Sequence, residues 1–417
     1  MISSTRTTSV VTFPSTSLPN FLPAEETGDS VIDVSHCQQA KHAQPASGDV
    51  FLSRRIKEEG RLIAVLSDGL GSGVKASVLA NLTATMALKY TQSFADVRQS
   101  AETIMDTLPV CEVRRISYST FTIVDIDAEG STRVIEHGNP EIALLRGEQE
   151  IHIDRRPVAM ERWKNRPLTY SAFAMQLGDR LVCCSDGVSQ SGLGRAGLPL
   201  GWGRNNLVHF IREMIQKDPQ SPAARLADAL VDKSLDNDGG DAKDDITAGV
   251  IHFRRPRRLL VVTGPPINRD RDNELADIVS TYPGRKAICG GTTANIIERI
   301  LGRPVKMDLT NLNPEVPPRS FMHGIDLVTE GTLTLVRVAE LLEKGPLPQK
   351  PQPNAAEELA ALVLGSDIID FVVGTRINQA HQDPNIPVEL DLRRNLIRRI
   401  TSLIEAVYLK QVSMRLM

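Results

Sequence analysis

The segment from Leu62 to Ser77, LIAVLSDGLGSGVKAS, joins an apolar run to a glycine-rich loop through one aspartate, Asp68. The apolar run predicts a buried strand. A helix is predicted from Val74 onward, because apolar residues recur at helical spacing at Val78, Leu82 and Met86. A loop of this kind, with a carboxylate at its mouth, can bind phosphate, hold a metal ion or simply turn the chain.

The length and composition of the chain favour a soluble protein of two or three domains. The chain has 417 residues, of which 41% are hydrophobic and 24% charged. Its formal net charge of −3 gives no reason to expect nucleic acid as a partner. Five cysteines, an odd number, do not suggest a disulfide framework, so we expect a cytoplasmic protein. No apolar stretch is long enough to predict a membrane span.

The first two parts of the chain differ in character. Residues 1–30 are rich in Ser, Thr and Pro and lack the apolar core of a signal peptide, so we expect a flexible N-terminal tail. Residues 31–254 are rich in strand patterns, with hairpins predicted to turn at Glu59-Gly60 and Glu129-Gly130. Antiparallel hairpins accompanied by helices predict two packed sheets with helices outside them.

A second domain is predicted over residues 258–417. There, short buried strands alternate with helical stretches, which is typical of a smaller, Rossmann-like α/β domain. The proline-rich stretch GPLPQKPQPN interrupts the alternation, and a long helix from Leu390 closes it.

Four aspartates of the region 31–254 share a context. Asp49 and Asp244 stand at strand starts, whereas Asp68 and Asp186 precede a glycine at strand ends. Each Asp-Gly pair by itself can be an ordinary turn. Carboxylates held at strand ends also suit hard divalent ions, which prefer oxygen ligands. Spacing alone favours the two interpretations about equally.

The order of the motifs resembles that of a known family. The chain carries, in sequence, SGDVF, SDGLGSGVKAS, ISYSTFTIVDIDAEG, EHGNPEIALLR, SDGVSQSG and DDIT. This order is similar to that of bacterial protein phosphatases of the SpoIIE (stage II sporulation protein E) family, which are metal-dependent PPM phosphatases. The resemblance implies a four-layer αββα sandwich of two antiparallel sheets. It also implies hydrolysis of phosphoserine or phosphothreonine with two divalent cations, Mn²⁺ or Mg²⁺.

Carried over residue by residue, the resemblance implies a set of metal ligands. Asp68 would bridge the two ions, and the carbonyl of Gly69 would complete one of them. Asp49 matches the acidic position that serves this ion, whereas Asp186 and Asp244 match the ligands of the other. Two ions lower the pKa of a shared water, which can then attack phosphorus in line.

Three residues near these motifs have open roles. Many PPM phosphatases carry an arginine on the first strand that holds the substrate phosphate, and this chain has none there. Lys41 and His42 are the nearest basic candidates, although either can be a solvated loop residue. Asp245 neighbours the metal ligands, and related phosphatases vary at that position.

The second domain contains a candidate anion site. The stretch ICGGTTANII predicts a strand, a glycine turn and a helix start, where Gly290, Gly291, Thr292 and Thr293 could hold an anion. It lacks the P-loop lysine and the dinucleotide-binding glycine spacing, so a tight turn remains the simpler interpretation. A second glycine turn at Glu330-Gly331 suggests the hypothesis that both turns serve one small anionic ligand.

We expect a serine/threonine phosphoprotein phosphatase with a regulatory C-terminal domain. The family's usual substrate, a phosphorylated anti-anti-sigma (STAS-type) protein, is the default partner. A small-molecule or protein regulator of the second domain and a homodimer are further expectations. One alternative is a non-catalytic module that keeps the fold to sense a phosphoprotein or ligand. Another is an enzyme whose main chemistry lies in the second domain.

Overall fold

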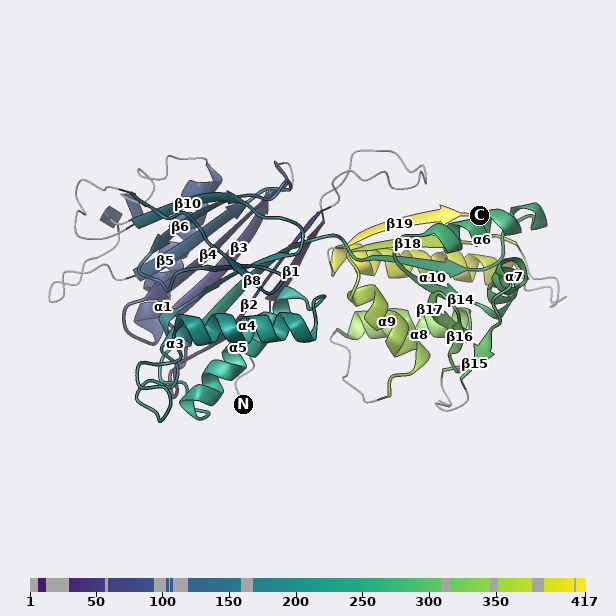
Figure 1. Ribbon diagram of the computed structural model, residues 1–417. Coiled ribbons are helices and arrows are strands. Elements are labelled where there is room, and N and C mark those ends of the chain that lie inside the picture. The colour runs from purple at the N-terminus through teal and green to yellow at the C-terminus, as the bar shows by residue number, and fades with distance from the viewer. Residues whose placement is uncertain are drawn as a thin grey trace. The chain divides into compact units, whose positions relative to one another are not determined.

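The computed structural model describes most of the chain, in two compact units. The described residues are 7–12, 30–56, 59–93, 103–104, 106–107, 119–158, 168–308, 316–345, 352–376, 386–408 and 410–417. The units are Met1–Arg255 and Pro256–Met417, and Figure 1 shows the elements of each. No helix in these described ranges is long and apolar enough to cross a bilayer.

The first unit contains two antiparallel sheets of six strands each. One sheet has the order β1-β2-β12-β11-β7-β8. Its strands are Thr7–Thr12, Val31–Gln39, Ile246–Arg254, Asp179–Cys184, Ala143–Arg146 and Gln149–Ile151, in that order. The other sheet has the order β3-β4-β5-β6-β10-β9. Its strands are Asp49–Ile56, Arg61–Gly69, Ser119–Ile126, Ser131–His137, Leu168–Ala174 and Arg156–Val158.

Strand β4 shows why the apolar run of the opening segment is continuous. Leu62, Ala64 and Leu66 pack in the core shared by strands of both sheets. The alternate residues Ile63 and Val65 pack on the other face with helix α1 (Val74–Gln92). Because successive side chains of a strand point to opposite faces, a strand buried on both faces needs an unbroken apolar sequence.

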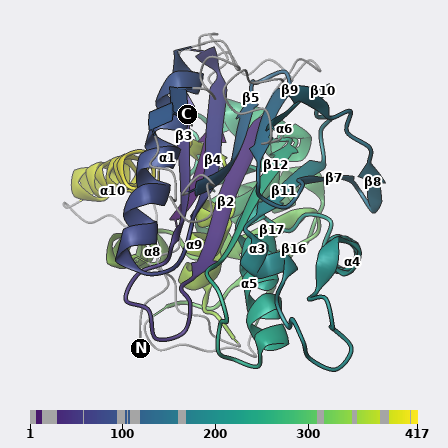
Figure 2. The same ribbon diagram turned by 90° about the vertical axis from the view of Figure 1, so that its left-hand side faces the viewer.

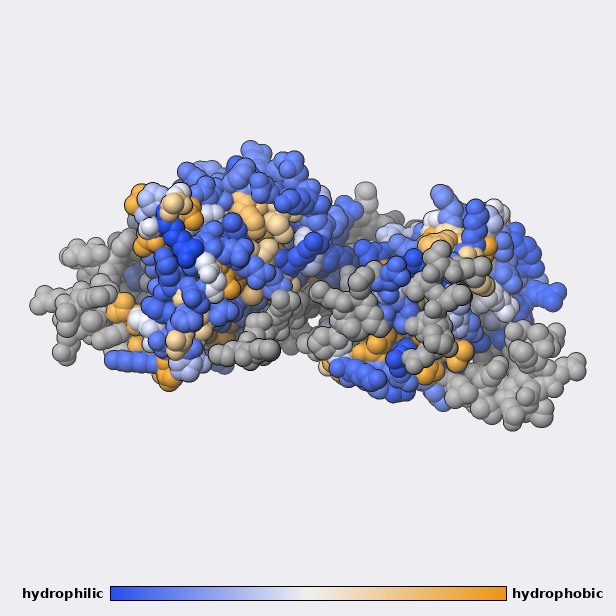
Figure 3. Space-filling view, turned by 90° about the horizontal axis from the view of Figure 1, so that it is seen from below, coloured by the Kyte–Doolittle hydropathy of each residue, from blue (hydrophilic) through white to orange (hydrophobic). Residues whose placement is uncertain are grey.

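Helices cover the outer faces of both sheets. Helices α4 (Gly203–Lys217) and α5 (Ala223–Asp238) pack on the sheet that contains β2 and β12. Figure 2 shows α1 on one side of the paired sheets and α4 and α5 on the other. The predicted four-layer αββα sandwich is therefore confirmed. The face in Figure 3 shows this unit as predominantly hydrophilic, with small hydrophobic patches.

Two expectations concern segments that the structure describes only in part. Within the expected tail, Thr7–Thr12 form strand β1, which pairs antiparallel with β2. These six residues are therefore a strand rather than tail, because the free edge of β2 offers them a partner. The remaining tail residues before Ser30 lie outside the described residues. The sequence also predicts a helical stretch near Phe94 to Leu108, and most of these residues lie outside the described ones as well.

The second unit is an α/β sheet with the order β15-β16-β17-β14-β13-β18-β19. The strands are Lys306–Met307, Ser320–Met322, Ile325–Thr329, Arg285–Cys289, Arg258–Thr263, Ile368–Val373 and Gln411–Leu416. Strands β17, β14, β13, β18 and β19 are parallel, and their chain order is 3-2-1-4-5, the Rossmann arrangement. The predicted smaller α/β domain is confirmed, whereas the edge strand β19 has no counterpart in the sequence prediction.

Helices lie on both faces of this sheet. Helices α6 (Asp272–Thr281) and α7 (Gly291–Leu301) pack with one face. Helices α8 (Thr332–Lys344), α9 (Ala355–Leu364) and α10 (Ile386–Ala406) pack with the other. Where two neighbouring strands are followed by helices on opposite faces, the chain leaves those strands in opposite directions.

Candidate functional site

The β3–β4 hairpin brings two of the predicted aspartates together. Asp49 is the first residue of β3, Asp68 is the penultimate residue of β4, and the antiparallel register makes them direct partners. The amide of Gly69 donates a hydrogen bond of 3.1 Å to the carbonyl of Gly48. A strand start therefore lies beside a strand end, and both carboxylates stand at one edge of the sheet.

The other sheet repeats this arrangement. Asp186 follows β11 as the first residue of the short helix α3 (Asp186–Ser189). Asp244 and Asp245 immediately precede β12, the antiparallel partner of β11. The amide of Ser185 donates a 3.0 Å hydrogen bond to the carbonyl of Thr247, which extends the pairing toward the aspartates.

Glycines allow close backbone contacts both between the two sheets and within each half of the site. A Cβ at Gly48 would lie 2.8 Å from Oδ2 of Asp245, so the β3 hairpin reaches the start of β12. A Cβ at Gly187 would lie 2.1 Å from the carbonyl oxygen of Asp245. A Cβ at Gly69 would lie 2.3 Å from the carbonyl oxygen of Ala76, where the loop after Asp68 meets α1. The glycines after Asp68 and Asp186 are thus required by packing as well as by turning.

Two of the five carboxylates, those of Asp49 and Asp245, are buried and have oxygens without a hydrogen-bond partner in the described structure. Asp49 is 2% exposed, and within the described residues neither of its side-chain oxygens accepts a hydrogen bond. Asp245 is 4% exposed, and its Oδ2 has no partner there either. An ionised carboxylate in this position is costly without a counterion.

The pKa values show how strongly these groups influence one another. Burial raises the pKa of Asp49 to about 8, against the opposing effect of the nearby hydroxyls of Ser185 and Thr247 and with a further contribution from the charges of Asp245 and Asp186. Burial and the charge of Asp49, followed by those of the other aspartates, raise the pKa of Asp68 to about 9. Burial and then the charge of Asp244 raise the pKa of Asp186 as well. Five carboxylates therefore share one electrostatic environment.

The donor set fits hard divalent cations by its chemistry. All five side chains offer oxygen, which Mg²⁺ and Mn²⁺ prefer. The unpartnered oxygens of Asp49 are buried acceptors for which a cation would compensate. In the described part of the chain, however, no three acidic, histidine or cysteine side chains are placed to hold one ion as they stand.

The two basic candidates lie in different surroundings. The backbone amide of Lys41 donates a 2.9 Å hydrogen bond to Oδ1 of Asp245. Its Nζ lies 3.8 Å from Oδ1 of Asp244, and the Lys41 side chain is 38% exposed. The Nδ1 of His42 lies 3.0 Å from Oδ1 of Asp241, and both of these side chains are mostly exposed. Of the two, Lys41 is the one beside the carboxylates.

Supporting residues had little or no signal in the sequence. Gln190 donates a 3.1 Å hydrogen bond from Nε2 to Oδ2 of Asp186, four residues earlier in the chain. Ser119 donates a 2.9 Å hydrogen bond from its hydroxyl to the carbonyl of Asp68. Asn139, from the motif EHGN, donates a 3.1 Å bond to the hydroxyl of Thr122 on the strand beside β4. All three residues lie in the ordered motifs SDGVSQSG, ISYSTFTIVDIDAEG and EHGNPEIALLR, but nothing in those motifs singled them out as supporting residues.

The candidate anion residues of the second unit lie at one turn. Gly290 precedes α7, and Gly291, Thr292 and Thr293 are the first three residues of that helix. Thr293 is fully buried, whereas Gly291 and Thr292 are exposed. Burial raises the pKa of the adjacent Cys289 to about 12, as expected of a core thiol.

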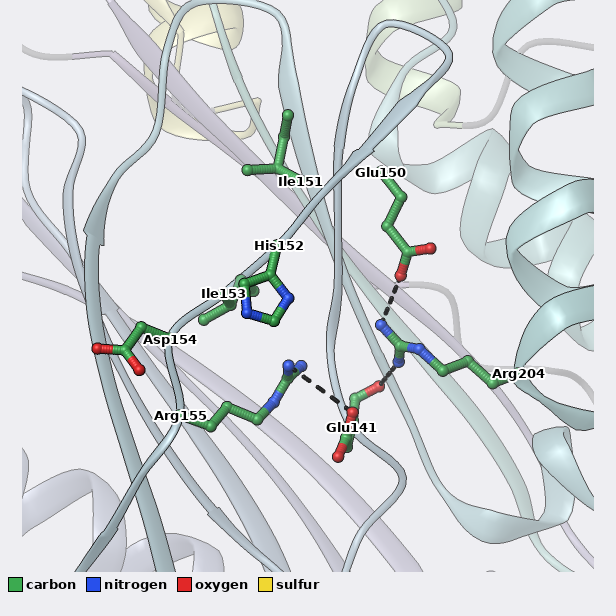
Figure 4. Close-up of a pocket in the computed structure, with 8 residues that line it drawn as sticks. All are labelled: Glu141, Glu150, Ile151, His152, Ile153, Asp154, Arg155 and Arg204. Atoms are coloured by element: carbon green, nitrogen blue, oxygen red, sulfur yellow. Dashed lines mark hydrogen bonds and ion pairs between the residues drawn. The ribbon is translucent and has the colours of Figure 1, made fainter.

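A separate pocket of about 560 Å³ opens elsewhere on the first unit (Figure 4). It is lined by Glu141, Glu150, Ile151, His152, Ile153, Asp154, Arg155 and Arg204. Arg204 donates a 2.6 Å bond to Glu150, and Arg155 donates a 2.9 Å bond to the carbonyl of Ile142. Both guanidinium groups are thus engaged, and none of the predicted site residues lines this pocket.

Comparisons with known proteins point to one family. Residues 58–254 match the family described as stage II sporulation protein E (SpoIIE). The stage II sporulation protein E of Bacillus subtilis (strain 168) is 24% identical over 215 residues, which cover 51% of this chain and 25% of that protein. The chain therefore corresponds to about a quarter of the length of this relative.

Solved structures are similar to this chain at lower identity. The phosphatase domain of Bacillus subtilis SpoIIE with a fragment of its regulatory domain is 21% identical, with a TM-score of 0.44. The match covers 55% of this chain and 65% of that one. RsbX in complex with magnesium is 15% identical, with a TM-score of 0.38, and the match covers 53% and 95% of the two chains. The sequence matches show that residues 58–254 are similar to the SpoIIE family, which confirms the resemblance found in the ordered motifs.

Proposed function

We propose that the first unit is a metal-dependent phosphatase that hydrolyses phosphoserine or phosphothreonine in proteins. One observation carries the proposal. Asp49 is buried among four further aspartates with both carboxylate oxygens unpartnered in the described structure. A bound cation would compensate the ionised form of this buried carboxylate, and the family match suggests the class of chemistry.

The ligands would come from both sheet edges. Asp49, Asp68 and the carbonyl of Gly69 would serve one Mn²⁺ or Mg²⁺, and Asp186, Asp244 and the bridging Asp68 would serve the other. Such ions, when bound, activate a water for attack on phosphorus and neutralise the phosphoryl oxygens. Ligation would draw the carboxylates closer than they stand in the structure.

The protein's own residues would hold and orient the reactants. The antiparallel strand pairs β3–β4 and β11–β12 fix the backbone beside the aspartates. The carboxylates would therefore be held in place before a substrate arrives. Lys41 is exposed enough to reach a substrate phosphate from the edge of the cluster, and its ammonium suits an anionic ester. His42 is the weaker candidate because it faces Asp241 rather than the cluster.

The substrate and the second unit complete the proposal. We infer a phosphoprotein substrate, with an anti-anti-sigma (STAS-type) protein as the first one to test. The second unit has its own hydrophobic cores and would act as a regulatory domain that responds to a small molecule or protein. A homodimer is the oligomeric state to examine first.

One observation favours a second candidate function. The aspartates do not stand closely enough for any three described side chains to hold an ion. A fold that had lost its metal could still recognise a phosphoprotein, as a sensing module without catalysis. Metal binding separates the two functions.

The decisive experiment measures metal binding and hydrolysis together. Calorimetric titration with Mn²⁺ and hydrolysis of p-nitrophenyl phosphate are compared for the wild type, Asp186→Asn and Asp236→Asn. Asp236 is an exposed residue of α5, so its substitution is the matched control. Binding and activity that vanish only in Asp186→Asn support the phosphatase. A wild type that binds no Mn²⁺ would instead support the sensing module.

A further inference from the structure

Two turns of the second unit lie side by side at the carboxyl end of the parallel sheet. Strands β14 and β17 are neighbours, with Cys289 opposite Thr329 at their ends. The amide of Gly290 then donates a 2.9 Å hydrogen bond to the carbonyl of Thr329, which ties the two turns together. A Cβ at Gly331 would lie only 3.5 Å from the Cα of Gly290.

The chain leaves these two turns toward opposite faces of the sheet. Helix α7, which begins at Gly291, packs in the core that contains Ile288 and Val328. Helix α8, which begins at Thr332, packs in the core that contains Cys289 and Leu327. Open α/β sheets bind their ligands beyond the carboxyl ends of the strands, where neighbouring connections part in this way.

The two helix starts present backbone amides that their own helices do not use as donors. The first helical hydrogen bonds are those from Ala294 to the carbonyl of Gly290 and from Leu335 to that of Gly331. Amides before Ala294 and Leu335 therefore have no acceptor within their own helix. Neither helix has a side-chain cap, and at 11 and 13 residues both are long enough to carry an N-terminal dipole.

A buried hydroxyl at each helix start provides an independent sign of a ligand. Thr293 and Thr334 are the third residues of their helices, and both are 0% exposed. Neither Oγ1 has a hydrogen-bond partner within the described residues. The Oγ1 of Thr293 lies 3.5 Å from the position of a Cβ at Gly290, so it points toward the glycine turn. A buried hydroxyl normally has a partner, and for Thr293 the missing partner would sit at the glycine turn.

We propose that the paired turns bind the phosphate group of a small phosphorylated molecule or free phosphate. The donors available are backbone amides and hydroxyls, and the helix starts carry partial positive charge, so an anion fits better than a cation. A tetrahedral phosphate has enough acceptor oxygens to accept bonds from both turns at once. The turns lack a dinucleotide-binding glycine spacing, which restricts the prediction to the phosphate group itself.

Glu330 limits the affinity of this site and offers a test of it. The residue lies between the strand end and Gly331, and its side chain is exposed. Its charge would oppose a phosphate at the neighbouring amides. Removal of that charge should therefore strengthen binding, whereas removal of a buried hydroxyl should weaken it.

The test is calorimetric titration of the full-length protein with inorganic phosphate at constant ionic strength. No divalent metal is added, so phosphate cannot bind through metal at the first unit. The wild type should bind one phosphate, and Thr293→Val and Thr334→Val should each bind it about tenfold more weakly. Thr293→Ser should retain the wild-type affinity. The control is Thr281→Val at the end of α6, where the hydroxyl donates a 2.7 Å bond to the carbonyl of Asp277.

A second variant keeps the test decisive if a buried valine disturbs folding, which circular dichroism would reveal. Glu330→Gln changes only an exposed charge and should tighten phosphate binding several-fold. The proposal is overturned if the wild type binds no phosphate at millimolar concentration, or if all variants bind equally. Phosphate binding is measured without reference to phosphatase activity. The outcome is therefore independent of the function proposed for the first unit.

Discussion

Asp49 and Asp68 are direct partners in the register of β3 and β4, so two carboxylates stand side by side on neighbouring strands. Like charges in directly opposite positions destabilise a sheet. This sheet nevertheless has Asp49 and Asp68 side by side at its edge. The charges of three more aspartates, from the other sheet, also raise the pKa of Asp68. The fold therefore maintains a local cost that a bound cation would remove.

The metal-free protein should lose stability as pH rises from about 4 to about 8. In the folded state the pKa of Asp49 is raised from its ordinary value of 3.8 to about 8. Between these values the folded protein keeps a proton that the unfolded chain has released. Because the folded state binds more protons, the free energy of unfolding falls with rising pH. Thermal melts of the wild type and Asp49→Asn in the presence of a chelator would measure this.

The difference between the two melting curves is the readout, because groups outside the aspartate cluster contribute equally to both. Inside the cluster, loss of the Asp49 charge also lowers the pKa of Asp68, which adds to the difference. The advantage of Asp49→Asn should grow through this pH interval to a few degrees near pH 8. A difference that stays constant with pH would show that Asp49 is ionised in the folded protein. Excess Mn²⁺ should reverse the order, since only the wild type keeps this ligand.

Substitution of Gly187 by alanine should disrupt the site without touching a carboxylate. The added Cβ would lie 2.1 Å from the carbonyl oxygen of Asp245, so the start of β12 must shift. We expect Mn²⁺ affinity and hydrolysis to fall at least tenfold, with a loss of stability of about 1–3 kcal/mol from overpacking. Calorimetric titration and thermal melting measure the two effects. Unchanged Mn²⁺ affinity in Gly187→Ala would refute a role of the close contact between Gly187 and Asp245 in placing the ligands.

Substitution of Lys41 by glutamine should affect substrate binding more than metal binding. Its ammonium lies at the edge of the cluster, 3.8 Å from Asp244, and is partly exposed. If it contacts the substrate phosphate, KM should rise about tenfold while the Mn²⁺ affinity changes little. His42→Gln is the matched control and should leave KM nearly unchanged. Equal effects of the two substitutions would mean that Lys41 has no special contact with the phosphate.

A chain that ends at Arg255 should retain basal, metal-dependent hydrolysis. The first unit closes at this residue and contains its own cores and all five aspartates. Its activity on p-nitrophenyl phosphate, measured beside that of the full chain, should stay within a few-fold. Complete loss of activity in a folded truncated protein would place the chemistry, or an indispensable part of it, in the second unit.

Much of the fold follows from local patterns. The alternation and continuity of apolar residues in β4 predict a strand buried on both faces, which is the position that it has. Glycines after Asp68 and Asp186 mark chain turns in the sequence, and the packing shows why alanine would not fit there. By contrast, Gln411–Leu416 reads as the end of a helical region, and it becomes strand β19 only because β18 offers a free edge. That partnership is not encoded locally.

The sequence by itself determined which residues are available for a site, namely aspartates at strand ends with glycines beside them. It also indicated a second α/β domain. Tertiary structure alone decided which of these groups meet. It buried Asp245 beside Gly48, placed Lys41 but not His42 at the cluster, and brought Gly290 against Gly331. Burial and charge coupling depend on distances between residues that are far apart in the chain. A local pattern therefore predicts a residue's secondary structure, whereas its pKa and its partners depend on the packed fold.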